Sequence, residues 1–281
     1  MLELAFSEQS LEVQRGVVME EFKQRCLNQP YGDVGHLIRP LAYEVHPYRW
    51  PTIGKDLSHI EQATLEEVKA FFYRFYAPNN AVLAVTGNIS WEEAVRLTEK
   101  WFGPIPRRNV PVRQLPQEPV QTQERRQVVK RPVPLDALFM AYHMCSRGHP
   151  DYYAFDILSD ILSNGRSSRL NRRLVQEQKL FSGIDAYISG TRDAGLLHIS
   201  GKPSAGVSLE QAEAAVRKEL QELQQVAIEE QELEKVKNKF ESTQIFGNIN
   251  YLNVATNLAW FELTGQAEDL SLIHISEPTR H

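Results

Sequence analysis

The order of apolar and polar positions near the start of the chain predicts a long helix. In residues 7–27 the apolar side chains fall at spacings of seven, four and four, which places them on one helical face. Ser7 or Ser10 is suited to the N-cap, and Pro30 ends the segment. The residues that define this face are Leu11, Val18, Phe22 and Cys26.

A strand between two capped helices is predicted next. The run Thr64-Leu65-Glu66-Glu67 has the form of a capping box and predicts a helix that Pro78 ends. Residues 80–89 are β-branched and apolar, which predicts a buried strand. Ser90-Trp91-Glu92-Glu93 then opens another capped helix that ends near Phe102.

The second half of the chain predicts alternating strands and helices. Strands are expected at 127–133 and 137–145, helices at 153–162 and 167–178, a strand pair at 184–189 and 195–201, and helices starting at Ser208, 231 and 251. Residues 82–95 and 197–216 both run from a strand through a glycine to a serine-capped helix. This similarity predicts two related α+β halves, although such a unit is common enough to recur by chance.

A proline-rich stretch separates the two halves. Five prolines and few large apolar residues occur between Gly103 and Glu124, which favours an extended linker. The expected division is residues 1–107 as the C-terminal part of a first domain, 108–125 as linker and 126–269 as a second, truncated domain. Residues 270–281 include Leu-Ser-Leu-Ile-His-Ile-Ser-Glu-Pro-Thr-Arg, which resembles a translated sequencing adapter. An ordinary polar tail is the alternative.

Composition is that of a globular protein and excludes few functions. Of 281 residues 42% are hydrophobic and 24% charged, and the net charge of -5 gives no reason to expect nucleic-acid binding. No apolar run reaches the roughly 20 residues of a membrane span. Two cysteines, Cys26 and Cys145, form no disulfide framework and do not indicate the compartment, so localisation is left open.

Candidate chemistry is concentrated on the first helix. Phosphate loops, nucleophile elbows and complete zinc motifs are not found in the sequence. Gln14 and Glu21 are seven residues apart and share one helical face, where two polar groups could meet a metal. Taken alone, Glu20 and Glu21 read as solvated charges on an amphipathic helix. His46, His59, His143 and His198 are not spaced as a zinc pair, so structural or surface roles are expected for them.

Ordered blocks along the chain change the interpretation of Glu21. The blocks are Gln14 to Arg25, Asn28-Gln29-Pro30-Tyr31-Gly32, His46-Pro47-Tyr48, Trp50-Pro51-Thr52-Ile53-Gly54, Tyr76-Ala77-Pro78-Asn79-Asn80 and Ser167-Ser168-Arg169-Leu170. In this order they resemble bacterial members of the insulinase, pitrilysin and mitochondrial-processing-peptidase family of zinc metallopeptidases. The resemblance covers nearly all of residues 1–269.

The resemblance implies a fold and a metal site. Each half of such a protein is an α+β domain with helices packed on one face of a largely antiparallel sheet, and the first domain is truncated here. The family binds zinc through two histidines of an inverted His-x-x-Glu-His helix and a downstream glutamate, which falls on Glu21. The general-base glutamate belongs to that motif and is expected before Met1. No catalytic residue is therefore expected within the chain, which alone should be inactive.

Two functions are consistent with this resemblance. The first is a fragment of a zinc-dependent endopeptidase that cleaves peptides or unfolded polypeptides in an enclosed chamber. The alternative is a non-catalytic partner subunit of the same fold, which binds peptides or acts structurally. Both imply peptide substrates and a homodimer or related subunit that completes the chamber.

Overall fold

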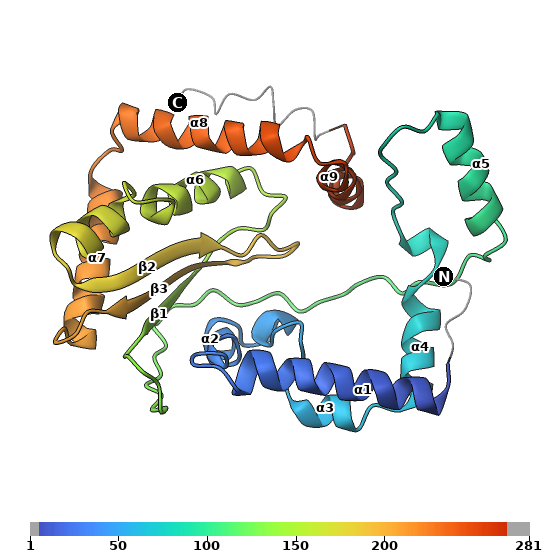
Figure 1. Ribbon diagram of the computed structural model, residues 1–281, viewed down its shortest axis with the longest axis horizontal. Helices are drawn as coiled ribbons and strands as arrows, with labels where there is room; N and C mark the ends of the chain where they lie inside the picture. The colour runs from blue at the N-terminus through green and yellow to red at the C-terminus, as the bar shows by residue number, and fades with distance from the viewer. Residues whose placement is uncertain (1–5, 269–281) are drawn as a thin grey trace. The chain divides into compact units, whose positions relative to one another are not determined.

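The computed structural model describes residues 6–268, which divide into two compact units (Figure 1). Unit 1 comprises residues 6–24, 52–115 and 241–268, and unit 2 comprises 25–51 and 116–240. Unit 1 contains α1 (Glu8–Phe22), α3 (Leu57–Glu61), α4 (Leu65–Phe75), α5 (Trp91–Phe102) and α9 (Tyr251–Thr264). Unit 2 contains α2 (Val34–Ala42), β1 (Leu138–His143), α6 (Tyr152–Ser163), β2 (Phe181–Ile188), β3 (Leu196–Pro203) and α7 (Leu209–Gln225), and α8 (Glu230–Gly247) begins in unit 2 and ends in unit 1.

Helix starts in both units follow the caps that the sequence predicts. Thr64 accepts a hydrogen bond from the Glu67 backbone, and the Glu67 carboxylate accepts one from the Thr64 backbone, so the capping box before α4 is complete. At the start of α5 the Ser90 side chain accepts a hydrogen bond from the backbone N–H of Glu93. At the start of α7 the Ser208 side chain accepts one from the backbone N–H of Gln211. The helices predicted from these caps are confirmed.

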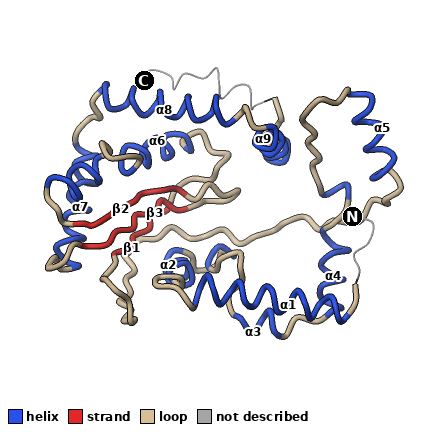
Figure 2. The backbone as a smooth tube through the Cα atoms, in the orientation of Figure 1, coloured by secondary structure: helices blue, strands red, loops and turns tan. Residues whose placement is uncertain are grey.

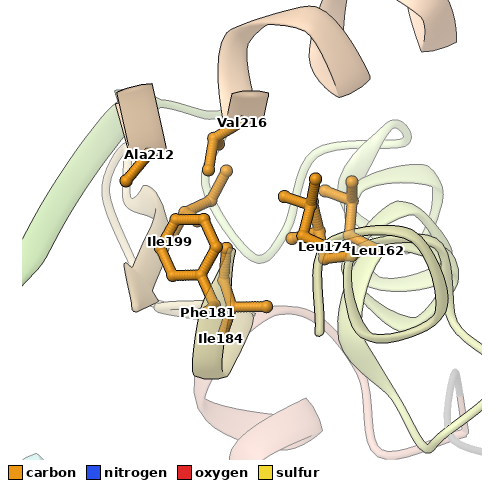
Figure 3. Close-up of a cluster of buried hydrophobic side chains, with 8 residues drawn as sticks. Leu162, Leu174, Phe181, Ile184, Ile199, Ala212 and Val216 are labelled. Carbon is orange, nitrogen blue, oxygen red and sulfur yellow. The ribbon is translucent and has the colours of Figure 1, made fainter. Parts of the chain in front are cut away.

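Unit 2 is built around a three-stranded antiparallel sheet in the order β1-β3-β2. Met140 of β1 and Ala186 of β2 both pair with Ile199 of the central strand. Helices α6 and α7 pack on one face of this sheet and enclose the main core, which is shown in Figure 3. Its buried residues are Leu162, Leu170, Leu174, Phe181, Ile184, Ile199, Ala212 and Val216. The predicted combination of helices with a small antiparallel sheet is confirmed.

The end of α2 and the residues that follow it, from Ala42 to Tyr48, pack on the other face of that sheet. Tyr43 is almost fully buried against Ala42 and Leu196, and its hydroxyl donates to the Ala194 carbonyl at 3.0 Å. Burial raises the pKa of Tyr43 to about 12. Glu118 fixes the linker within unit 2, because its carboxylate accepts backbone N–H bonds from Glu44 and from the two residues that follow it.

Two predicted strands are not formed. A short 3-10 turn at Pro78–Asn80 precedes an irregular, largely exposed stretch that runs to residue 89, and no strand exists among the described residues of unit 1. Residues 127–133 are also irregular, and Figure 2 draws the whole stretch between α5 and β1 as loop. A β-branched run becomes a strand only when a neighbouring backbone satisfies its N–H and C=O groups, and within residues 6–268 neither run is paired into a sheet.

Two helices of the structure were not predicted, and the tail lies outside it. α2 has apolar residues at helical spacing, Val34, Leu37, Ile38 and Leu41, but Pro40 within this run argues against a helix, and α3 is too short, at five residues, to give a periodic pattern. The expected adapter sequence at 270–281 lies outside the described residues. The division into domains at 107 and 126 stays a prediction.

Gly201 of β3 shows how tightly the core beneath the sheet is packed. A Cβ on Gly201 would lie 2.7 Å from two ring carbons of Phe181 and 3.2 Å from Ile184. Gly201→Ala is therefore expected to lower the free energy of unfolding by about 1–3 kcal/mol, measured by urea denaturation. Gly183→Ala is the matched control, because nothing lies within 4 Å of a Cβ there. Equal stability of the two variants would contradict the packing argument.

Candidate functional site

The candidate metal-ligand residue, Glu21, lies at the end of α1. Ser7 caps this helix, as predicted, because its hydroxyl accepts a hydrogen bond from the Ser10 backbone at 3.1 Å. The α-helix ends at Phe22, and a π-helical turn follows at Lys23–Leu27. Together the two segments span the predicted helix 7–27. Turns of π-helix within helices occur frequently at functional sites.

The two neighbouring glutamates have different surroundings. Glu20 is exposed, and its carboxylate accepts a hydrogen bond from the side chain of Gln24 at 3.2 Å. Glu21 is half-buried and precedes the buried Phe22. Glu20 therefore faces solvent, whereas Glu21 lies at the edge of the buried face. Gln14, one heptad earlier, is exposed.

Arg15 fixes α1 within unit 1. Its guanidinium donates to the backbone carbonyls of Ile60 at 3.1 Å, Ala63 at 2.9 Å and Glu61, all at the C-terminal end of α3. This end of a helix carries unsatisfied carbonyls and a partial negative charge, so a cation is favourable there. No local pattern could indicate this contact, because the partners are backbone atoms 45 to 48 residues away.

The described residues do not by themselves assemble a zinc site. Zinc in proteins takes three or four side-chain ligands that converge on one point. Within residues 6–268, no group of three or more His, Cys, Asp or Glu side chains is arranged to hold a metal ion. Glu21 alone does not fit a complete site.

The histidines of unit 2 make contacts typical of structural residues. His46 is buried, its Nδ1 accepts a hydrogen bond from the Tyr48 backbone, and its Nε2 lies 3.4 Å from a carboxylate oxygen of Asp193. His198 stacks on Tyr187 with ring centroids 4.9 Å apart. Burial, with the nearby charge of Arg39, lowers the pKa of His198 to about 4, so the ring is neutral near pH 7.

Most of the arginines around the linker and after α6 are engaged in ion pairs. The pairs are Arg125 with Glu44, Arg126 with Glu124 and Glu213, Arg131 with Asp33, Arg169 with Glu232, and Arg173 with Glu219 and Glu222. Their charges are thereby neutralised in place.

Throughout residues 6–268, no helix has the length and apolar character needed to cross a bilayer.

Two known proteins of similar sequence are both named zinc proteases. The chain is 30% identical over 229 residues to zinc protease PqqE of Helicobacter pylori, covering 80% of this chain and 51% of that protein. It is 24% identical to the uncharacterized zinc protease YmxG of Bacillus subtilis, covering 85% of this chain and 56% of that protein. The chain thus spans about half the length of these curated relatives.

Solved structures share the fold. The crystal structure of a protease from Helicobacter pylori matches with a TM-score of 0.88 at 27% identity, over 98% of this chain and 67% of that one. A peptidase M16 inactive domain from Pseudomonas fluorescens matches with a TM-score of 0.83 at 20% identity, over 97% of this chain and 64% of that one, which shows the fold alone.

The family model described as the peptidase M16 inactive domain matches residues 62–240, more than half of the chain. That range contains the three-stranded sheet and its core, but not α1 or Glu21. The chain therefore belongs to the peptidase M16 family, the insulinase-type metallopeptidases, and contains the inactive domain of that family.

Proposed function

We propose that the chain is part of a longer zinc-dependent endopeptidase that cleaves peptides or unfolded polypeptides between paired domains, and that Glu21 supplies one zinc ligand. The observation that carries the proposal is the placement of Glu21, half-buried at the end of α1 and followed by a π-helical turn. The relatives named zinc proteases support it, and the chain spans only 51–56% of their length.

The role proposed for Glu21 is to hold the metal. A carboxylate oxygen is a common zinc ligand beside imidazole nitrogens, and bound zinc lowers the pKa of a coordinated water. Arg15 would act as a positioning residue, because it fixes α1 to the end of α3. The histidine ligands and the general-base glutamate are proposed to come from sequence that precedes residue 1 in the gene. A homodimer or a related subunit would complete the chamber.

The experiment that tests the proposal compares the chain with a longer version. The DNA before Met1 is read first, and an in-frame His-x-x-Glu-His is expected. The longer protein should then bind about one zinc per chain, measured by elemental analysis, and cleave unstructured peptides until a chelator is added. The 281-residue chain alone should do neither. A reading frame without the motif would exclude catalysis by this subunit and leave the non-catalytic partner function.

A further inference from the structure

Three consecutive backbone amides of unit 2 converge on one carboxylate. The N–H groups of Glu44, Val45 and His46 all donate to the side chain of Glu118. The last two donate to the same oxygen, Oε2, at 3.1 Å and 2.8 Å. Successive N–H groups that point to one place form a concave anion site, a backbone nest. We call these three amides the 44–46 nest. Because a carboxylate occupies it in the structure, the nest has the geometry to bind this chemical group.

The shape of the 44–46 nest depends on contacts that do not involve Glu118. Tyr43, just before the nest, is buried, and its hydroxyl donates to the Ala194 carbonyl at 3.0 Å. His46, at the other end, is also buried, and its Nδ1 accepts a hydrogen bond from the Tyr48 backbone at 3.2 Å. These contacts fix the turn on both sides. The three amides should therefore keep their directions without Glu118, and a preorganised site loses little entropy when a ligand binds.

Glu118 reaches the nest from an exposed stretch of linker. Of residues 116–120, only Glu118 is not exposed. Pro119 restricts the residue before it to extended conformations, so the linker presents the carboxylate at a low entropic cost. Val45 is 45% exposed, which places the nest at the surface of unit 2. A carboxylate from outside the chain could therefore reach the nest once the linker has moved away.

The state of Glu118 agrees with an anion site. Burial alone would raise the pKa of Glu118, but the three backbone hydrogen bonds and the nearby His143 outweigh burial and lower it. Glu118 is therefore ionised near pH 7. Removing its carboxylate would leave three donors directed at one point, and donors in this arrangement favour another anion over a neutral group.

We propose that the 44–46 nest is a binding site for peptide carboxylates, and that Glu118 occupies it as an intramolecular competitor. A carboxylate at the C-terminus of a peptide or on an acidic side chain would accept the same three hydrogen bonds. An external carboxylate must displace Glu118, so the linker acts as an autoinhibitory strap. All groups of this site lie in unit 2, whereas Glu21 lies in unit 1, so this proposal and the zinc proposal fail separately.

The test compares the unchanged 281-residue chain with Glu118→Ala and follows the backbone amide signals of residues 44–46 by NMR. The probes are acetyl-Ala-Ala with a free C-terminal carboxylate, acetyl-Glu-amide with only a side-chain carboxylate, and acetyl-Ala-Ala-amide with none. In Glu118→Ala, at least one carboxylate probe should shift all three amide signals saturably. In the unchanged chain the same probe should need a concentration about tenfold or more higher, because a tethered carboxylate competes at a high effective concentration.

The probes also decide the source of the carboxylate and whether the proposal stands. The carboxylate probe that saturates at the lower concentration shows whether a C-terminus or an acidic side chain is the better ligand. If neither shifts the 44–46 amides saturably in Glu118→Ala, the proposal is wrong. Equal shifts with acetyl-Ala-Ala-amide, or equal affinity in the unchanged chain, would also overturn it.

A second variant keeps the test valid if Glu118→Ala does not fold. Unchanged amide signals of Ile184 and Ile199 in the main core show that a variant is folded. Glu118→Gln keeps the size of the side chain and removes only its charge, so it enters the same titration if the alanine variant fails this check. The same outcomes then support or overturn the proposal.

Glu124→Ala is the matched control. Glu124 is also a carboxylate of the linker region, but its partners are the guanidinium groups of Arg126 and Arg217. Glu124→Ala should bind the probes as weakly as the unchanged chain. An equal gain of affinity in Glu124→Ala and Glu118→Ala would mean that loss of any negative charge is sufficient, and the proposal would be overturned.

Discussion

Changing Glu21 to glutamine in the longer protein is expected to abolish both zinc binding and peptide cleavage. Glutamine keeps the size of the side chain but removes the negative charge, and a neutral amide is a much poorer zinc ligand than a carboxylate. Loss of an outer-shell partner already costs roughly 10–100-fold in metal affinity, so loss of a direct ligand should cost more. Zinc content after dialysis and the rate of cleavage are the two measurements.

Glu20→Gln is the matched control for this change. Glu20 is the adjacent residue on the same helix, carries the same charge and contacts Gln24 at the surface. It should retain zinc and activity, and thermal unfolding of both variants should be close to that of the unchanged protein. If Glu21→Gln keeps its zinc and its rate, the ligand assignment is wrong whatever the family.

The elements that the sequence predicted correctly are those specified by local signals. The capping box at Thr64 and Glu67 uses four consecutive residues, and the serine caps at Ser90 and Ser208 act within one turn. The antiparallel pair β2–β3 was also predicted, because a short turn joins two apolar runs. Such signals need no knowledge of distant parts of the chain.

The prediction of strands at 80–89 and 127–133 was wrong for a physical reason. Their composition suits a sheet, but a strand is stable only beside a partner, and composition does not reveal whether one exists. Val128 is 77% exposed and Leu83 55% exposed, as expected for apolar runs that have no sheet to join. The helix α2 was missed although Val34, Leu37, Ile38 and Leu41 have helical spacing, because Pro40 argues against a helix there. α3 is only five residues long and gives no periodic signal.

The candidate site was only partly predictable from the sequence. From the residues alone both Glu20 and Glu21 were expected to be solvated, but their exposures differ, because adjacent residues point about 100° apart around a helix. The zinc role came from the resemblance of the ordered blocks, and it stays a proposal. The Arg15 contacts depend on residues far apart in the sequence, so no local pattern could have indicated them.

Arg169 forms a buried ion pair in unit 2. Its side chain is 6% exposed, and its guanidinium donates to both carboxylate oxygens of Glu232, with Nη2–Oε2 at 2.7 Å and Nε–Oε1 at 3.1 Å. This two-bond geometry joins the turn after α6 to the start of α8. The Arg169 guanidinium therefore belongs to the buried interior of unit 2 and not to its surface.

Arg169→Ala is expected to lower the free energy of unfolding by about 3–5 kcal/mol, because it leaves the carboxylate of Glu232 partly buried without its counter-ion. Urea denaturation of the 281-residue chain measures the change. Arg172→Ala is the matched control: its side chain is 50% exposed and 3.8 Å from Glu177, so the cost should stay below about 1 kcal/mol. Combining Arg169→Met with Glu232→Leu should restore most of the loss, because the unpaired carboxylate is then gone. If Arg169→Ala costs no more than Arg172→Ala, the buried pair does not hold α8 in place.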